Sequence, residues 1–247
     1  MAQPLRWQVG TVTEIHPETA RAKTFTIALP EWMVHRAGMH YDIRLTAPDG
    51  YQAERSYSIA SEPEIKGQID LTVELIPDGE VSPYLHEVVM KGDHLELRGP
   101  IGGYFVWDVG LGGPLLLVGG GSGVVPLMAM IRHRVAVDSV IPTRLLYSIR
   151  TPEDVFYATE LQELNARGEG FELIQTFTRQ APSGWTGYRR RIDREMLSEV
   201  IKPFGAGGVH AYICGPTLLV EAVANTLLDL GVPTQRILAE RFGPTGT

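Results

Sequence analysis

Residues 115–240 alternate short apolar runs with segments long enough to form helices, and this alternation constrains the fold more than any other feature. Strand–helix alternation is typical of a parallel sheet that is covered by helices on both faces. The predicted strands are 115–118, 143–147, 171–177, 209–213 and 236–240. The predicted helices are 125–137, 157–167, 194–200 and 218–230, the last of which is closed by Gly231.

The first 110 residues have a different pattern, with short runs rich in Val, Thr, Ile and Phe separated by turn residues. Six such runs predict an antiparallel barrel. They span 7–15, 23–29, 41–47, 56–60, 69–75 and 94–98. A single helix is expected at 83–90, with Ser82 as N-cap and Pro83 as its first residue. Glycines and a proline cluster between Asp108 and Pro114, which predicts two domains, 1–110 and 111–247.

Composition excludes several classes of function. The one cysteine, Cys214, allows no internal disulfide, Cys-ligated iron–sulfur cluster or zinc finger, and we expect no metal. The net charge of −7 argues against non-specific binding to nucleic acid. Residues 1–110 carry 9 Lys and Arg against 16 Asp and Glu, whereas residues 111–247 carry 13 of each. No apolar run is long enough to span a membrane and the N-terminus lacks a signal-peptide pattern, so a cytoplasmic location is expected.

A glycine-rich loop follows the predicted strand 115–118 and opens a helix. It reads Gly-Gly-Gly-Ser-Gly-Val-Val-Pro over residues 119–126, and it matches neither a P-loop nor a hydrolase elbow. A purely structural turn would seldom need four glycines in five positions. The loop therefore predicts close approach of a nucleotide, as at the first strand–helix turn of a dinucleotide-binding fold.

Three further motifs gain meaning from their order. Arg55-Ser56-Tyr57-Ser58 places an arginine fork and an aromatic ring on one side of a strand, which suits a phosphate and a flat heterocycle. Residues 79–85 combine a glycine turn with a helix start, where free N–H groups suit a pyrophosphate. Cys214-Gly215-Pro216 ends a predicted parallel strand, where ligands bind in such folds. Each alone also fits an ordinary strand, a capped helix or a buried cysteine.

Together and in this order, the four motifs resemble the ferredoxin–NADP reductase family over essentially the whole chain. The resemblance implies an N-terminal barrel that binds FAD and a C-terminal doubly wound domain that binds NAD(P)H. It implies that Ser58, Cys214 and Glu240 lie at the reacting centre, with Ser58 near flavin N5. Glu240-Arg241-Phe242 resembles the family's segment that closes over the flavin, although here the chain continues to Thr247.

The resemblance also implies a set of cofactor-binding residues. For the flavin these are Arg55, Ser56, Tyr57, Ser58, Val73, Glu74, Leu75, Gly79, Val81, Ser82 and Phe242. For the coenzyme they are Gly120, Gly121, Ser122, Gly123, Val124, Pro126, Ser148, Arg150, Arg179, Cys214, Gly215 and Pro216.

The function expected from this resemblance is transfer of a hydride from NAD(P)H to FAD, followed by release of electrons to a separate acceptor such as a ferredoxin or an oxygenase component. Two alternatives stay open: a small-molecule acceptor such as free flavin, a quinone or a ferric chelate, and a regulatory module without turnover. Ser148, Arg150 and Arg179 favour NADPH over NADH, because guanidinium groups suit a 2′-phosphate. Arg189, Arg190 and Arg191 form either a second phosphate contact or a solvated loop.

Overall fold

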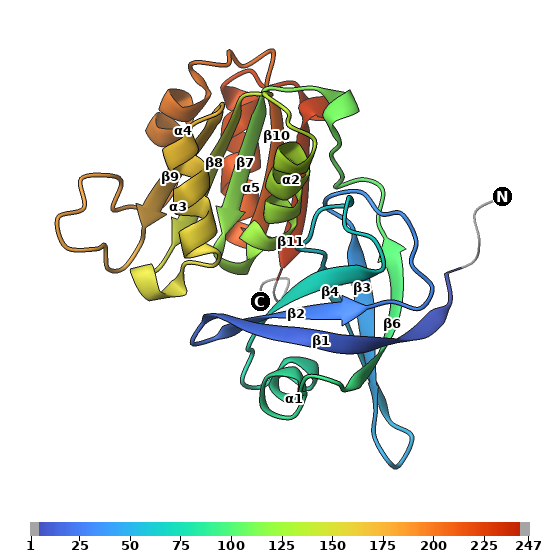
Figure 1. Ribbon diagram of the computed structural model, residues 1–247. Helices are drawn as coiled ribbons and strands as arrows, with labels where there is room; N and C mark the ends of the chain where they lie inside the picture. The colour runs from blue at the N-terminus through green and yellow to red at the C-terminus, as the bar shows by residue number, and fades with distance from the viewer. Residues whose placement is uncertain (1–4, 243–247) are drawn as a thin grey trace.

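A computed structural model describes residues 5–242 and shows two lobes, each built on one sheet (Figure 1). The first sheet is antiparallel, with strand order β4-β3-β6-β1-β2-β5. Its strands are β1 Trp7–Thr19, β2 Ala22–Ala28, β3 His40–Thr46, β4 Gln52–Ser58, β5 Gln68–Glu74 and β6 His94–Ile101. The predicted antiparallel barrel is therefore confirmed.

Two elements of the barrel lie elsewhere than predicted. Strand β4 begins at Gln52, four residues before the prediction, because its polar residues face an ion-pair network on the outer surface. Helix α1 spans Val81–Glu87, so Ser82 and Pro83 lie inside it and the N-cap is Glu80. The Ser82 hydroxyl instead accepts a hydrogen bond from the Ile76 backbone N–H at 3.0 Å and is buried. Ser82 therefore fixes the preceding turn rather than capping the helix.

The second sheet is parallel, with strand order β11-β10-β7-β8-β9. Its strands are β7 Leu115–Gly120, β8 Thr143–Ile149, β9 Phe171–Phe177, β10 His210–Pro216 and β11 Ile237–Phe242. The helices are α2 Val124–Ala136, α3 Ala158–Arg167, α4 Arg194–Ile201 and α5 Thr217–Asp229. Strands β8 and β9 lie on one side of β7, whereas β10 and β11 lie on the other side, so the order of the strands reverses between β7 and β10. Such a switch point is where a crevice opens at the carboxyl ends of the strands.

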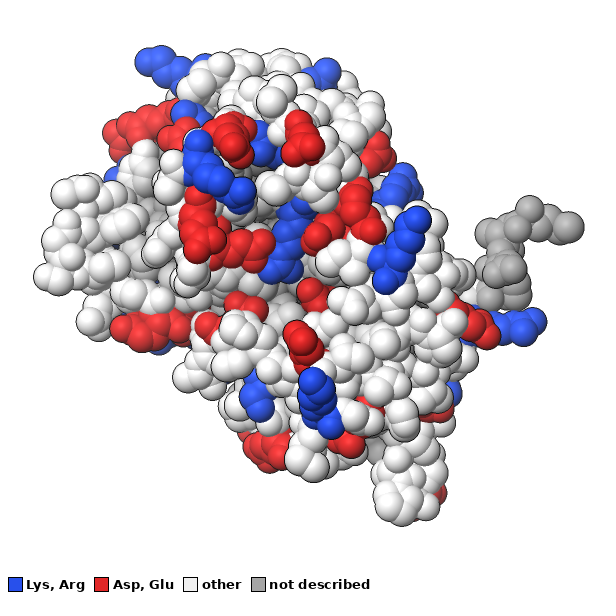
Figure 2. All heavy atoms as spheres, viewed as in Figure 1, with Lys and Arg blue, Asp and Glu red and all other residues white. Residues whose placement is uncertain are grey.

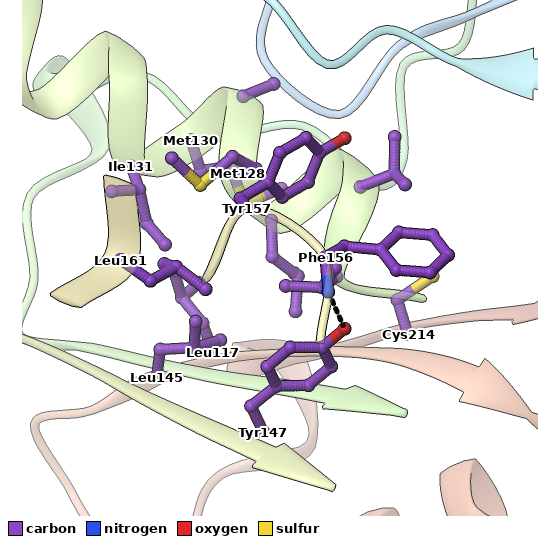
Figure 3. Close-up of a cluster of buried hydrophobic side chains, with 14 of the residues drawn as sticks. Leu117, Met128, Met130, Ile131, Leu145, Tyr147, Phe156, Tyr157, Leu161 and Cys214 are labelled. Carbon is purple, nitrogen blue, oxygen red and sulfur yellow. Dashed lines mark hydrogen bonds between the residues drawn. The ribbon is translucent and has the colours of Figure 1, made fainter. Parts of the chain in front are cut away.

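Alternate residues of β7 pack on opposite faces of this sheet, as a doubly covered strand requires. Leu115 and Leu117 pack in a core with α2 and α3. Leu116 and Val118 pack in a second core with α4 and α5. Figure 3 shows part of the first core, which contains Leu117 of β7, Leu145 of β8, Leu161 of α3 and the two tyrosines Tyr147 and Tyr157. The prediction of helices on both faces is confirmed.

The carboxyl ends of the parallel strands point toward the barrel (Figure 1). The segment between the lobes contains a short 3₁₀ helix, Val109–Leu111. A boundary at residue 110 stays a prediction. Among the described residues, no helix has the length and apolar character that a membrane span requires.

Candidate active site

The glycine loop at the end of β7 packs directly on the Cys214-Gly215-Pro216 turn at the end of β10. A Cβ on Gly123 would overlap the carbonyl group of Cys214, and a Cβ on Gly215 would lie 3.1 Å from the Gly120 backbone. Gly121 differs, because its φ is +55° and a Cβ there would meet nothing within 4 Å. Gly120 and Gly123 thus let two loops approach each other, while Gly121 faces open space where a ligand can lie.

The other predicted residues of this loop either pack inside the domain or lie at its open side. Val124 and Pro126 lie in the first turn of α2 and are buried, so they hold the helix start against the sheet. Ser122 is half-buried at the open side of the turn, beside Gly121. Of the loop side chains, Ser122 is therefore the one placed to contact a ligand.

Cys214 and Glu240 are paired in the register of β10 and β11. Burial raises the pKa of the Cys214 thiol, and the nearby Glu240 raises it further. Burial also raises the pKa of Glu240 to about 7. Glu240 Oε2 and the Thr217 hydroxyl are buried and have no hydrogen-bond partner among the described residues. Unpaired buried polar atoms of this kind are rare and point to a missing partner such as a ligand.

The predicted flavin strand presents its residues on two faces. Arg55 and Tyr57 pair with Ile43 and Tyr41 on the inner face of the barrel, where Tyr57 is half-buried. Burial raises the pKa of Tyr57 to about 12, and nearby Arg55 acts against this rise. Arg55 remains exposed, with Nη2 3.1 Å from Glu80 Oε2. An aromatic ring and a guanidinium group thus lie together beside the start of α1.

The two serines of this motif lie on the opposite face. Ser56 donates to Asp42 Oδ1 at 2.6 Å, within the outer ion-pair network that includes Arg98. Ser58 is buried at the end of β4, opposite His40. The structure therefore gives Ser56 a structural partner, and its predicted contact with flavin gains no support. The role of Ser58 stays a prediction.

The second predicted flavin segment lies at the end of β5 and the start of α1. Val73 and Val81 are buried in the barrel core, whereas Glu74 and Leu75 are half-buried. Gly79 donates its N–H to the Ile76 carbonyl, so its own N–H is occupied within the turn. A Cβ on Gly79 would lie 3.0 Å from the Ile76 carbonyl oxygen, which explains the glycine by the tightness of the turn.

The predicted coenzyme phosphate site lies where β8 and β9 end. The backbone N–H of Arg179 donates to the carbonyl of Arg150 at 3.0 Å, so the two arginines are adjacent, and both side chains are exposed. Ser148 lies on β8, two residues before Arg150, and is buried. Glu153 and Asp154 are the two carboxylates that could instead accept a ribose diol. Asp154 Oδ2 already accepts hydrogen bonds from the N–H and hydroxyl of Thr151, whereas the role of Glu153 stays open.

The arginine run in the next loop has partners of its own. Arg190 is ion-paired with Asp193 and, at 3.0 Å, with Glu195. Arg189 donates to the Trp185 carbonyl. These contacts favour the interpretation that this run stabilises its own loop.

Phe242 is half-buried and is paired with Pro216 in the register of β10 and β11. It packs against the core shared by β7 and α2, beside the Cys214 turn. The tail that continues past Phe242 lies outside the described residues. Among residues 5–242, no group of His, Cys, Asp or Glu side chains could hold a metal ion.

Sequence reasoning missed several residues at this site. Thr217 and Tyr41 carry polar atoms at or beside the predicted cofactor positions, and no pattern within the predicted segment 79–85 signals the contact of Glu80 with Arg55. Their types alone give no signal, since a helix-start threonine or a strand tyrosine is common in any fold. Only their position next to Pro216, Arg55 and Tyr57 distinguishes them.

Comparison with known proteins agrees with this geometry. Residues 8–106 match the family model for an oxidoreductase FAD-binding domain, and residues 117–225 match that for an oxidoreductase NAD-binding domain. The chain is 31% identical to ferredoxin–NADP reductase B of Sorangium cellulosum over 98% of both sequences. It belongs to the ferredoxin–NADP reductase family. The chain therefore contains an oxidoreductase FAD-binding domain followed by an oxidoreductase NAD-binding domain.

The chain is also similar to part of a longer relative and to a solved structure. The chain is 33% identical to the glycine betaine monooxygenase reductase subunit of Chromohalobacter salexigens over 80% of this chain, but it spans only about half of that relative, 53%. The fold also matches the flavohem-like FAD/NAD-binding domain of nitric oxide dioxygenase from Vibrio cholerae, with a TM-score of 0.85 and 24% identity, over 96% of this chain and 99% of that one.

The residues present fit both cofactors of the ferredoxin–NADP reductase family. The open space at Gly121 and the unpaired atoms of Glu240 and Thr217 fit a nicotinamide coenzyme at the β7–β10 switch point. Arg55 and Tyr57 fit the phosphate and ring of a flavin on the barrel. When bound, FAD supplies the redox chemistry by accepting a hydride and releasing electrons to an acceptor.

Proposed function

We propose that this chain takes reducing equivalents from NADPH, through bound FAD, to a separate acceptor protein. The observation that supports this best is the orientation of the second sheet, whose strands point their carboxyl ends toward the barrel (Figure 1). Cys214 and Glu240 pair in the C-terminal halves of β10 and β11. The two proposed cofactor sites would thus face each other across the domain junction. Hydride transfer requires donor and acceptor atoms to approach to about 3–3.5 Å, and sites that face each other are a precondition for that approach.

The residues of the chain have distinct tasks in this proposal. Arg55 holds the pyrophosphate of FAD, and Tyr57 packs on its ring system. Cys214 and Glu240 line the coenzyme side, where the raised pKa of Glu240 allows it to donate or accept a hydrogen bond near neutral pH. Phe242, packed beside Pro216, excludes water from the same edge.

We further propose that the coenzyme is NADPH. Arg150 and Arg179 are neighbours at the carboxyl ends of β8 and β9, and both are exposed to receive an anionic group. Two guanidinium groups match the charge of a 2′-phosphate better than that of a ribose diol.

The acceptor is proposed to be an iron–sulfur protein or an oxygenase component. Support comes from the name of the Chromohalobacter relative, a monooxygenase reductase subunit, and from the single cysteine of this sequence, which cannot ligate a cluster. A cytoplasmic location, predicted from the sequence, is part of this proposal.

Purification and reduction test the function directly. The protein should carry FAD and its flavin absorbance should bleach on addition of NADPH; a protein that binds flavin but is not bleached by either coenzyme would support the regulatory module instead. Reoxidation should then be faster with iron–sulfur proteins from the same genome than with free flavin, a quinone or a ferric chelate. Faster turnover with one of these small molecules would overturn the proposed acceptor class.

Salt dependence tests how the acceptor docks. Acidic and basic side chains are interspersed on the face shown in Figure 2, and residues 1–110 carry 16 acidic against 9 basic side chains. Gross charge attraction to an acidic ferredoxin is therefore not expected, and raising the ionic strength should increase or barely change the rate. A steep loss of rate with salt would contradict this.

A further inference from the structure

A buried tyrosine of the nucleotide domain contacts the barrel at the domain junction. Tyr157 precedes α3, is 4% exposed, and its hydroxyl donates to Thr72 Oγ1 of β5 at 2.5 Å. Its backbone N–H donates to Glu18 Oε2 of β1 at 3.2 Å. Figure 3 shows its ring beside Met128 and Met130 of α2, pointing away from Tyr147. One residue thus contacts two strands of the other domain through two separate groups.

These contacts close into a ring of hydrogen bonds whose direction is fixed. The Thr24 hydroxyl donates to Glu18 Oε1 at 2.7 Å, because a carboxylate can only accept. The Thr24 and Thr72 oxygens are 2.7 Å apart, and Thr72 must therefore donate to Thr24. The Tyr157 hydroxyl then donates to Thr72, which completes the ring back to Glu18. Every donor in this ring is used once, as a buried polar network requires for a unique arrangement.

Arg132 of α2 adds a second connection to the barrel. Its Nη1 donates to the carbonyl of Ala60, just past the flavin strand β4, at 2.9 Å. Its other nitrogens bind both carboxylate oxygens of Glu160, at 2.6 and 2.9 Å, and its guanidinium carbon lies 5.0 Å from the centre of the Tyr157 ring. Although burial acts to lower it, hydrogen bonding to Glu160 raises the pKa of Arg132. Arg132 therefore stays charged at the domain junction.

The backbone at Tyr157 is also unusual. Its φ of 56° and ψ of 32° place a bulky residue in the left-handed region, which such residues rarely adopt. A conformation of this kind persists only where surrounding contacts determine it, and these positions cluster at functional sites. Here the determining contacts are those to Glu18 and Thr72.

We propose that Tyr157, supported by Arg132, is a positioning residue that sets the distance between the two reacting rings. Thr72 directly precedes the flavin segment that starts at Val73, and Ala60 follows Arg55-Ser56-Tyr57-Ser58 by two residues. On the other side, α2 follows the glycine loop, and Tyr157 follows β8, which ends at Ile149 directly before Arg150. The network thus connects both flavin segments to both coenzyme loops.

The inference rests on the reductase function and deepens it. Since a small misplacement of reacting groups costs a large factor in rate, loosening this network should slow hydride transfer without releasing either cofactor. A purely structural role would instead lower stability and leave the rate of the folded enzyme unchanged.

The test uses variants that remove one hydroxyl each in the FAD-loaded protein. Tyr157→Phe keeps the ring, and Thr72→Val keeps the shape of the side chain. Both should bind FAD fully, but reduce it about tenfold more slowly at saturating NADPH, with KM changed by less than about twofold. Hydrogen–deuterium exchange of residues 155–161 and 69–75, followed by mass spectrometry, should be faster in both variants, whatever the acceptor.

Two variants serve as controls. Tyr147 is also fully buried, and its hydroxyl accepts from the Phe156 N–H within the nucleotide domain (Figure 3). Tyr147→Phe should therefore lower stability without slowing reduction. Thr72→Ser, which keeps the hydroxyl, should reduce at close to the wild-type rate.

Three results would overturn the proposal. The first is a wild-type rate of flavin reduction in Tyr157→Phe and Thr72→Val. The others are a rate in Tyr147→Phe as low as that in Tyr157→Phe, or equally low rates in Thr72→Ser and Thr72→Val. If the wild-type protein itself is not reduced by either coenzyme, the reductase function fails. In that case the connection between the domains is still tested by hydrogen–deuterium exchange. If Tyr157→Phe exchanges at the same rate as the wild type, that connection is overturned as well.

Discussion

Glu240 lies opposite Cys214 across β10 and β11, and its Oε2 has no hydrogen-bond partner within residues 5–242. The pairing puts a carboxyl group of raised pKa beside a thiol that burial keeps protonated. The thiol therefore stays a donor at neutral pH, and Glu240 can also donate there in its protonated form, whereas an ordinary glutamate is ionised and only accepts. The edge of the sheet where the coenzyme is proposed to bind is consequently rich in neutral donors.

Glu240→Gln should alter the pH dependence of stability. Because the pKa rises from 4.5 to about 7 on folding, the folded protein binds more protons than the unfolded chain within that window. Ionisation of Glu240 therefore lowers the free energy of unfolding of the wild type as pH rises through this window, and the whole loss of stability is present above it. At about pH 8 the variant should be more stable to urea by about 1–3 kcal/mol, and near pH 4 the two should agree. Glu163→Gln, on the exposed side of α3, is the control and should show no such difference.

Arg55→Ala should lose FAD. Charge-assisted hydrogen bonds contribute about 1.5–3 kcal/mol, so the Kd for FAD should rise about 10- to 100-fold, measured as the flavin-to-protein ratio and by titration of the apoprotein. Arg44→Ala is the matched control, since Arg44 binds Glu96 on the outer face of the barrel, and it should retain flavin. Full occupancy in Arg55→Ala would contradict the assignment.

Replacing both coenzyme arginines should change specificity. In Arg150→Ala plus Arg179→Ala, kcat/KM for NADPH should fall about 10- to 100-fold while that for NADH changes little, because only the phosphate contacts are lost. Arg190→Ala, which removes ion pairs to Asp193 and Glu195, should leave both values near wild type. Steady-state kinetics with each coenzyme decides this. A wild-type preference for NADH would defeat the proposal.

Gly123→Ala should destabilise the nucleotide domain. The new methyl group would overlap the Cys214 carbonyl, a contact that only backbone movement can relieve. Overpacking of this kind costs about 1–3 kcal/mol, which urea unfolding would detect. Gly207→Ala adds a methyl group where nothing lies within 4 Å and should be nearly neutral. Equal stability of the two variants would show that the two loops can separate without cost.

Most of the fold could be predicted from the sequence, because local pattern and global architecture agree in the second half. The strand at Phe171–Phe177 has the predicted bounds, and the helix starting at Arg194 begins where Asp193 caps it. The pattern failed at β4, where Gln52 and Glu54 look like loop residues. They lie in a strand because both pair with β3, where Gln52 is opposite Thr46 and Glu54 is opposite Arg44. Glu54 also lies beside Arg44 and Arg98 on the outer face.

Sequence reasoning predicted only those residues of the site that belong to a motif. A motif names Arg55 and Cys214, but it cannot show that Glu80 faces Arg55 or that Ser56 turns toward Asp42. The contact between Tyr157 and Thr72 joins residues 85 positions apart. Nothing in the local sequence of either residue signals it, since a tyrosine and a threonine at these places fit any amphipathic segment. Such contacts become visible only when the two domains are placed together.

The burial of Cys214 has a practical consequence for studies of domain motion. Because it is the single cysteine of the sequence and its thiol is buried with a raised pKa, alkylating probes should leave the native protein unmodified. Cysteines introduced at exposed sites, such as Val34 on the barrel and Val140 on the nucleotide domain, can then be derivatised selectively without first removing the native one. A pair of spin labels or fluorophores at such sites would report the separation of the two domains in solution during turnover.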